Sequence, residues 1–277
     1  MKRRYFDPAR VPRSPFIPAT DALVHTSAPL ASEVDFSNLC TIRNQGSEGA
    51  CTGFGETGQY EVARAVAGLR PKGMLFSPQF LYYLEGLKEG HPGEDTGAVP
   101  TDGLAILQHI GVAPESLDPY VVGQIRPPSK EAMTAAQQYR IKSWSPVSRI
   151  ASGVPRTSLI PVLTLLAARR PLNIAISVYE SFEDAAGGVI PMPGLGDALL
   201  GGHDMYLVGY KDDSAFAGGG YVMAANSWGT QWGRSGFALI PYAFAGDPEL
   251  MLGLWSIELS KAAPRATSLW RRVCGGA

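Results

Sequence analysis

The sequence changes its pattern near the middle of the chain, and this change is the strongest constraint on its fold. The first half carries segments with the apolar spacing and end signals of helices, at 52–69, 78–88 and 102–109. After one more helical segment, the second half carries short strand-like runs between glycine-rich loops: 158–170 is the helical segment, and the runs are 173–179, 205–210, 221–225, 236–240 and 254–259. Helices followed by antiparallel strands predict an α+β fold, with a helical lobe at about 40–140 beside a barrel-like antiparallel β lobe at about 141–262.

Composition supports a globular chain and argues against two classes of partner. Hydrophobic residues make up 45% of the 277 residues, enough for a substantial core, and charged residues make up 18%. The formal net charge of -1 gives no positive field that would draw the chain to nucleic acid or to an anionic membrane. No apolar run has the length of a membrane-spanning helix. We therefore expect neither nucleic acid nor membrane as a partner, and we expect a monomer without cofactor or metal.

The two ends of the chain differ from its middle. Residues 1–29 hold five prolines, which predicts an extended arm without a core of its own, and a disordered tail is the alternative. The first ten residues are basic, but no apolar stretch follows them, so a conventional secretory signal is missing. This pattern predicts a cytoplasmic protein or one exported by a non-standard route. Residues 263–277 are interpreted as a C-terminal tail.

Among three cysteines, Cys51 has the surroundings that suggest chemistry. Cys40 and Cys274 are the other two, so at most one disulfide can form. Glycines lead up to Cys51 within 45–54, and a helix is expected to begin there. The partial positive charge of a helix N-terminus stabilises a thiolate, which is the nucleophilic form of cysteine. A small, inert, buried cysteine is the alternative interpretation.

A nucleophilic cysteine needs a base, and His203 is the best placed of the four histidines. It opens the strand at 205–210, and the start of a strand holds a side chain rigidly. His25 lies in the proline-rich arm, His91 in a polar loop and His109 in the last turn of a helix. We expect these three to be structural or solvated.

Asn226 follows directly after a strand and is a candidate for orienting the base. Its amide oxygen can accept a hydrogen bond from the imidazole N–H and so fix the tautomer. Trp228, two residues later, would shield that bond from water. A hairpin turn is the alternative for the segment 226–233, since Asn, Ser and Gly favour turns.

Together these segments resemble the papain family of cysteine proteases. The stretch 45–54 resembles the family's nucleophile segment, 201–210 resembles its histidine strand, and 226–233 is similar to its asparagine motif almost residue for residue. The order Cys, His, Asn is also that of the family, and the resemblance spans about 30–259. It implies the papain-like two-lobe fold with the active-site cleft between the lobes.

The resemblance also implies roles for individual residues. Cys51 would attack the scissile carbonyl of a peptide or protein substrate, and His203 would pair with the thiolate and protonate the leaving amine. Asn226 would orient His203, while the Gln45 side chain and the Cys51 backbone N–H would form the oxyanion hole. The backbone stretch that pairs with an extended substrate would be Gly97 and Ala98, and the remaining substrate-binding positions would be Val99, Pro100, Ala175 and Gly202. The pocket for the residue two before the cleavage point is expected to be apolar.

Three positions depart from the family pattern and leave alternatives open. Glu48 stands where typical members have a disulfide cysteine, Thr52 replaces an aromatic residue, and Gly53 replaces alanine. These changes resemble a bacterial branch of the family, of which xylellain is one member. Residues 1–29 are too short for an inhibitory domain, but they could form a strap across the cleft of a zymogen. A deamidase, an acyltransferase or transglutaminase-like enzyme, and a non-catalytic binding module remain alternatives to an endopeptidase.

Overall fold

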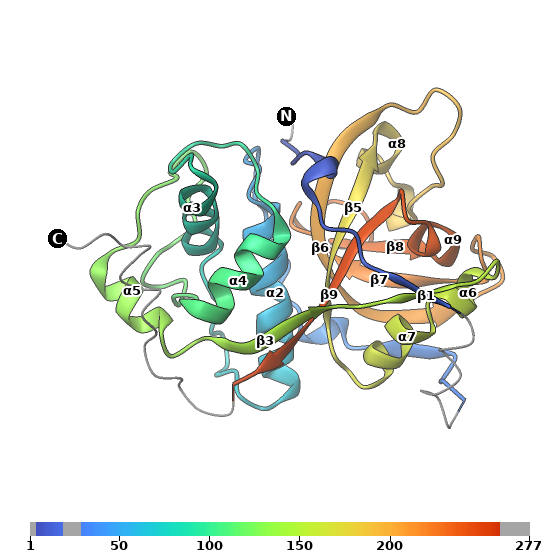
Figure 1. Cartoon of the computed structure of the whole chain (residues 1–277), viewed down its shortest axis with the longest axis horizontal. Helices are drawn as coiled ribbons and strands as arrows, with labels where there is room; N and C mark the ends of the chain where they lie inside the picture. The colour runs from blue at the N-terminus through green and yellow to red at the C-terminus, as the bar shows by residue number, and fades with distance from the viewer. Residues whose placement is uncertain (1–3, 19–28, 261–277) are drawn as a thin grey trace.

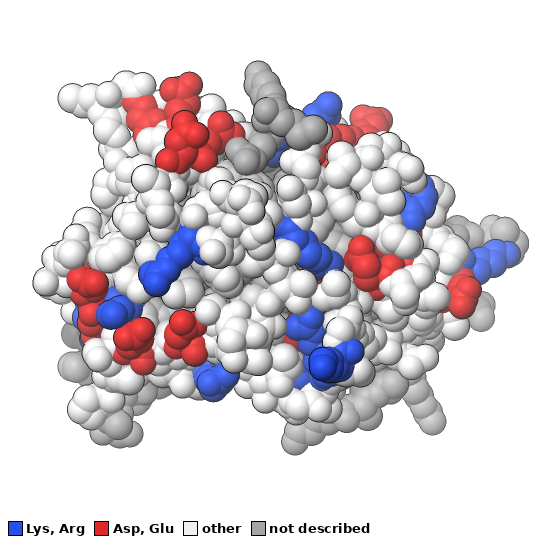
Figure 2. All heavy atoms as spheres, turned by 180° about the vertical axis from the view of Figure 1, so that it is seen from behind, with Lys and Arg blue, Asp and Glu red and all other residues white. Residues whose placement is uncertain are grey.

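A computed structural model of the chain describes residues 4–18 and 29–260. Helices gather on one side and a β-sheet on the other, and the blue N-terminal segment runs along the junction between them (Figure 1). Within the described ranges, no helix is both long and apolar enough to span a bilayer. Basic side chains are spread over the rear face rather than gathered into one patch (Figure 2).

The helical side is built on α2 (Cys51–Val66), with α3 (Pro78–Glu89), α4 (Pro100–His109) and α5 (Lys130–Ala136) around it. Ser77 caps α3 as expected, because its hydroxyl accepts the N–H of Phe80 at 2.9 Å. Gly90 ends the same helix at φ 90°, a conformation that favours glycine. The expected helices of the first half are therefore present, while α5 was not predicted.

The β side is one seven-stranded sheet with all pairs antiparallel. Its order is β3 (Ile141–Pro146), β9 (Met251–Leu259), β5 (Leu172–Tyr179), β6 (Leu199–Asp212), β7 (Gly220–Ala225) and β8 (Phe237–Pro241), with β2 (Glu33–Asp35) added to β6. The sheet does not close on itself, because β3 and β8 are the two ends of the path. The α+β class is thus confirmed, with a curved open sheet rather than a closed barrel.

Short elements complete the fold. These are β1 (Phe16–Pro18), β4 (Arg149–Ala151), η1 (Pro8–Arg10), η2 (Ser37–Leu39), η3 (Ala186–Gly188), α8 (Glu180–Glu183) and α9 (Tyr242–Gly246). The predicted helix at 158–170 is wrong in one respect: the chain forms two helices, α6 (Pro155–Ser158) and α7 (Ile160–Ala167). Pro161 explains the break, because it has no N–H to continue an earlier helix and suits the first turn of a new one.

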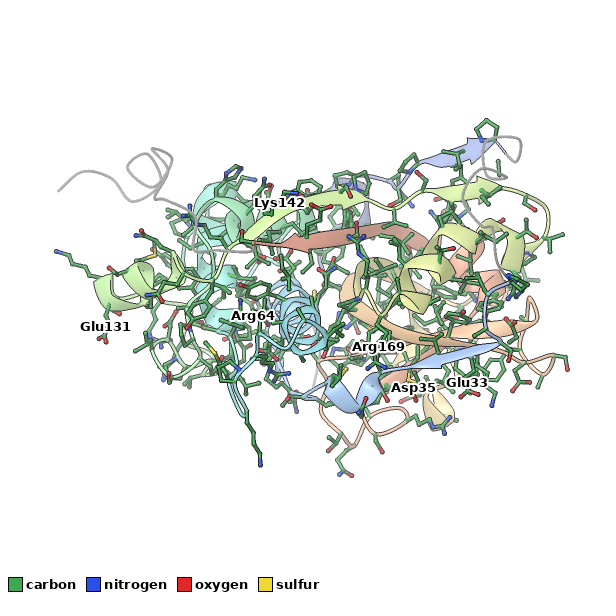
Figure 3. All side chains as sticks on the ribbon, turned by 90° about the horizontal axis from the view of Figure 1, so that it is seen from below. Glu33, Asp35, Arg64, Glu131, Lys142 and Arg169 are labelled. Atoms are coloured by element: carbon green, nitrogen blue, oxygen red, sulfur yellow. The ribbon has the colours of Figure 1, made fainter. Side chains whose placement is uncertain are left out.

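Helix α2 is the central support of the molecule. It packs against β6 as well as against α3 and α4, so it contributes to both sides. Seen from below, α2, which carries Arg64, lies between the helical side with Glu131 and the strand that carries Glu33 and Asp35 (Figure 3). The start of α2 is therefore held where the two sides meet, and Cys51 is its first residue.

Candidate active site

Cys51 lies at the first position of α2 and is fully buried. Its thiol accepts hydrogen bonds from the backbone N–H groups of Asp204 and Thr52, which places the sulfur against the residue that follows His203. Burial raises the pKa of this thiol well above its usual value, and the nearby carboxyl groups of Asp204 and Glu85 raise it further. The helix N-terminus, which the sequence predicts would stabilise a thiolate, therefore lies beside a thiol whose burial favours the neutral form.

His203 lies inside β6, not at the start of a strand as predicted. The strand begins four residues earlier, at Leu199, and His203 pairs with Ile176 of β5. Pairing with β5 fixes the backbone at this position more firmly than a strand start would. Nε2 of His203 lies 2.8 Å from Oδ1 of Asn226. The Trp228 ring covers this contact, with ring centroids 4.7 Å apart.

Asn226 and Trp228 occupy the long loop that connects β7 to β8. The Asn226 N–H donates to the Gly236 carbonyl across this loop at 2.9 Å. The same segment therefore forms a turn and also carries the two candidate site residues. Asn226 Oδ1 accepts from His203 and also from the Ser227 N–H at 2.7 Å. The amide is thereby oriented with its oxygen toward the imidazole.

Gln45 is buried beside the same loop. Its side-chain nitrogen donates to the Glu48 carbonyl at 2.7 Å, and its side-chain oxygen accepts from the Ser227 hydroxyl. Its backbone N–H donates to the Ser227 carbonyl at 2.8 Å. The amide at the turn before Cys51 is therefore held in one orientation by groups from both sides of the molecule.

Phe6 of the N-terminal arm fills the space over these residues. Its backbone exchanges two hydrogen bonds with Gly202, at 3.2 and 2.8 Å, and its ring belongs to the same buried apolar cluster as Cys51 and Ala175. A methyl group on Gly202 would overlap the Phe6 ring, and one on Gly97 would lie 3.1 Å from the Phe6 Cα. Two bare glycines thus allow the arm to approach closely.

Charged contacts from both sides hold the rest of the arm. On the helical side, Arg4 pairs with Asp95 at 3.2 Å and Arg10 pairs with Glu89. On the sheet side, the Tyr5 hydroxyl donates to Glu183, and Arg13 lies 3.7 Å from Glu249. The Tyr5 ring also lies edge-on to His203, with centroids 6.4 Å apart. Residues 4–18 therefore cross the junction in contact with both sides.

Three predicted substrate-binding residues, Ala98, Val99 and Pro100, lie on the helical side, at or just before the start of α4. Ala98 packs with Ala50, Phe54 and Tyr82 inside the helical side. The Val99 N–H donates to Glu89 at 2.8 Å, and Pro100 begins α4.

The other histidines lie outside this group. Nδ1 of His91 lies 2.9 Å from the Thr96 hydroxyl, and its Nε2 lies 3.4 Å from Glu89. His109 is the last residue of α4. The prediction for His25 falls outside the described residues.

Glu48 and Thr52 have structural roles that sequence reasoning missed. Glu48 accepts the Tyr120 hydroxyl at 2.6 Å and the Gly123 N–H, so a buried carboxylate ties the nucleophile loop to the loop at 120–123. The Thr52 hydroxyl donates to Glu85 at 2.6 Å. Both residues depart from the family pattern, and a polar side chain at a position expected to be buried is the sequence signal that a new polar partner lies nearby.

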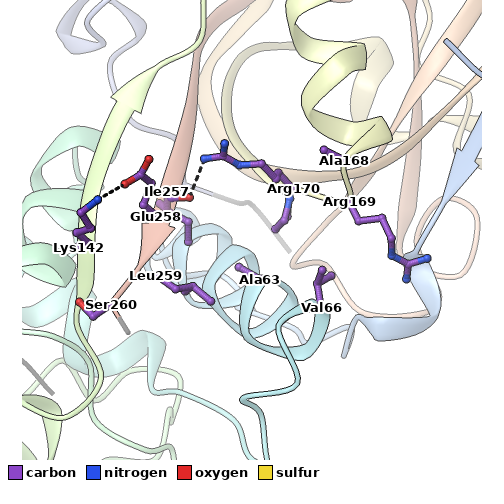
Figure 4. Close-up of a pocket in the computed structure, with 11 residues that line it drawn as sticks. Ala63, Val66, Lys142, Ala168, Arg169, Arg170, Ile257, Glu258, Leu259 and Ser260 are labelled. Carbon is purple, nitrogen blue, oxygen red and sulfur yellow. Dashed lines mark hydrogen bonds and ion pairs between the residues drawn. The ribbon is translucent and has the colours of Figure 1, made fainter. Parts of the chain in front are cut away.

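Several hollows open on the surface. One of about 720 Å³ lies between the end of α2 and β9, lined by Val66, Arg169, Arg170 and Glu258 among others, and none of the candidate residues faces it (Figure 4). Two more, of about 670 and 470 Å³, lie on either side of Arg4 and Asp95. The arm therefore lies in a groove that stays open at its flanks.

Comparisons with known proteins agree with this geometry. Residues 30–246 match the family model described as papain family cysteine protease. The chain is 26% identical to xylellain, a cysteine protease from Xylella fastidiosa, with a TM-score of 0.75 over 94% of this chain and 98% of that one. The bromelain protease of Ananas comosus, at 19% identity, shares the fold with a TM-score of 0.62, covering 83% of this chain and all of that one.

Curated relatives show the same likeness. An uncharacterized peptidase C1-like protein of Acanthamoeba polyphaga mimivirus is 27% identical over 78% of this chain and 68% of its own length. Cathepsin B-like CP3 of Giardia intestinalis is 28% identical over 70% of this chain and 62% of its own length. The chain thus spans about two thirds of the length of these two relatives. With the family model matching most of the sequence, the chain belongs to the papain family of cysteine proteases.

Proposed function

We propose that this cysteine peptidase is an endopeptidase in which Cys51 is the nucleophile and His203 its base. The supporting observation is the arrangement of three segments around one point. The Cys51 thiol is hydrogen-bonded by the backbone of Asp204, and the preceding residue, His203, has its Nε2 bound to Asn226. Because Nε2 is engaged by the amide, Nδ1 is the ring nitrogen that exchanges a proton with the thiol.

The reaction follows from these roles. His203 takes the thiol proton, and the Cys51 thiolate attacks the scissile carbonyl carbon. The carbonyl oxygen gains negative charge, which the Gln45 amide and the Cys51 backbone N–H stabilise as hydrogen-bond donors. The imidazolium then gives its proton to the leaving amine, and the resulting thioester is hydrolysed by water that His203 activates.

The substrate is proposed to occupy the groove that Phe6 fills. Gly97 and Gly202 offer a bare backbone edge to an extended peptide, and Ala175 contributes to the apolar space beside it. A bulky apolar side chain fits that space, so we propose an apolar preference two residues before the cleavage point. A profile of cleavage over a peptide library tests this preference and also separates hydrolysis from deamidation or acyl transfer.

The arm is proposed to inhibit the enzyme in its resting form. Phe6 and substrate need the same glycines, and Cys51 is fully buried while the arm is in place. The charged contacts at Asp95 and Glu89 would hold the strap until it is cut or displaced.

Replacing the nucleophile tests the catalytic proposal. Cys51→Ala should abolish both peptide hydrolysis and labelling by an epoxide inhibitor of cysteine proteases. Cys40→Ala is the matched control, because Cys40 is the second free thiol of the described chain and its sulfur is hydrogen-bonded to Tyr206. Hydrolysis that survives in Cys51→Ala would overturn the assignment.

A further inference from the structure

Three carboxyl groups meet directly beneath the nucleophile. Glu56 of α2, Glu85 of α3 and Asp204 of β6 are 0%, 0% and 1% exposed. Gly103 of α4 closes the group, because a methyl group there would overlap an oxygen of Glu56 and an oxygen of Glu85 at once. The two side chains therefore converge on one small volume that exists because position 103 has no side chain.

Hydrogen-bond donors satisfy only part of this group. Glu85 accepts the Thr52 hydroxyl at 2.6 Å, and Asp204 accepts the Asn173 amide at 2.7 Å. Neither oxygen of Glu56 takes a hydrogen bond of normal geometry from the described chain, although the backbone N–H of Leu104 lies near it. The second oxygens of Glu85 and Asp204 are likewise without a donor there. Buried carboxylates that lack donors are costly, whereas protonated carboxyl groups supply donors of their own.

The charged groups that face the cluster do not neutralise it. From α3 and α4, Lys88 and Asp102 approach it, but these two pair with each other at the surface. Glu89 of α3 adds a negative charge and is itself paired with Arg10 of the arm. Cys51, from the first turn of α2, is a further titratable neighbour. Three negative charges in this dry space would be unbalanced, so the group must keep protons at neutral pH.

The cluster is connected to the nucleophile through two short paths. The backbone N–H of Asp204 and that of Thr52 both contact the Cys51 thiol, and the Thr52 side chain contacts Glu85. Burial raises the pKa of all three carboxyl groups, and that of Glu85 rises to about 8. A proton lost from the cluster therefore leaves a negative charge beside the atom that must itself become negative.

We propose that Glu56, Glu85 and Asp204 are positioning residues that keep their protons while the enzyme works and suppress the Cys51 thiolate when they lose them at alkaline pH. This rests on the proposed role of Cys51. Each ionisation releases one proton to solvent and adds one negative charge beneath the thiol. The charge stabilises the neutral thiol against the thiolate, so the rate of attack falls as pH rises. The cluster, rather than His203 alone, then sets the alkaline limit of activity.

Isosteric amides separate this role from a structural one. The full-length protein and its Glu56→Gln variant would be compared by kcat/KM on one peptide between pH 6 and 10. Glu56→Gln removes a titrating group, keeps its shape and touches no reacting atom. We expect the alkaline half-point to move up by about one pH unit, which is a roughly fivefold higher rate where the unmodified protein has lost nine tenths of its activity. Glu258→Gln, at an exposed carboxylate of β9, should leave the profile unchanged.

A second readout keeps the proposal testable if peptide hydrolysis fails. The rate of Cys51 alkylation by iodoacetamide, read at the level of the Cys51 peptide by mass spectrometry, reports the thiolate directly. Arg4 and Arg10 of the arm keep their positive charge over this pH range, so a change in the alkylation rate does not arise from deprotonation of these arginines. The alkylation profile should shift in Glu56→Gln and in Asp204→Asn. Alkylation profiles that coincide with that of the unmodified protein in both variants would overturn the proposal, whether or not the protein cleaves peptides.

Discussion

The proposed base and the proposed nucleophile of this protein rest on opposite kinds of support. Behind His203 lie uncharged groups, the amide of Asn226 and the ring of Trp228, which itself packs against Phe182 and Trp232. Beneath Cys51 lie carboxyl groups. The groups behind His203 carry no titratable charge, whereas the carboxyl groups beneath Cys51 gain negative charge when they lose protons at high pH. Under the proposed function, the comparison teaches that one site can join a base in an uncharged setting to a nucleophile whose setting changes its charge with pH.

Removing the His203 imidazole should have the largest effect. His203→Ala should lower kcat/KM by roughly 10²- to 10⁴-fold, the usual contribution of a positioned acid–base group. His91→Ala is the matched control, since His91 contacts Thr96 and Glu89 outside the site. Steady-state hydrolysis of a peptide substrate measures both. Equal losses in the two variants would show that His203 has no special role.

Releasing the arm should have the next largest effect, in the opposite direction. Phe6→Gly removes the ring that fills the groove and should raise the initial rate of peptide hydrolysis by about tenfold or more, because a buried Phe side chain contributes about 3–5 kcal/mol. Phe16→Gly changes the same arm at a side chain that is 37% exposed and should leave the rate nearly unchanged. A Phe6→Gly protein no faster than the unmodified chain would contradict inhibition by the arm.

The Glu48 contacts give a smaller effect, on stability. Glu48→Ala leaves the Tyr120 hydroxyl and the Gly123 N–H without their acceptor and should reduce the free energy of unfolding by about 1–3 kcal/mol. Glu48→Gln retains an acceptor oxygen and should lose less. Urea denaturation at pH 7 measures the difference, and identical midpoints for all three proteins would show that this carboxylate does not stabilise the loop.

The buried carboxyl group of Glu56 should give the smallest effect, and one that depends on pH. Burial raises the pKa of Glu56 in the folded chain well above the usual 4.5. Below pH 4.5 the carboxyl group is protonated in both the folded and the unfolded chain, so its ionisation has no effect on stability there. As pH rises further, the unfolded chain releases this proton more readily, so stability is lost. Glu56→Gln should therefore raise the melting temperature by about 2–4 °C at pH 9, corresponding to about 1 kcal/mol, and by less at pH 5. A gain that is equal at both pH values would contradict this account.

Much of the fold could be predicted because local patterns matched local structure. The Ser77–Pro78 start of α3 and the run that becomes β5 are local signals, and both elements form as expected. The extension of β6 back to Leu199 was not predictable, because its glycines Gly201 and Gly202 argue against a strand when read alone. They are accommodated there by β5 on one side and by Phe6 on the other.

The candidate site, like the fold, could be predicted from the sequence only in part. The resemblance of three segments to a known family predicted that Cys51, His203 and Asn226 act together, and Nε2 of His203 lies 2.8 Å from Oδ1 of Asn226. The carboxyl cluster could not be read from the sequence, because Glu56, Glu85 and Asp204 lie far apart along the chain and each looks like an ordinary surface acid. Their burial follows only from how α2, α3 and β6 pack together.

Gly202 is the point where the arm docks and, under the proposed function, the edge to which substrate would bind. Any side chain added at Gly202 would clash with the arm and with a bound substrate. Substitutions in the groove would therefore weaken binding of the arm and binding of the substrate together. Selection could then adjust the resting activity of such an enzyme mainly through the arm, whose residues take no part in the chemistry. The arm would be free to diverge rapidly among descendants of this chain, while the groove beneath it would be held nearly constant.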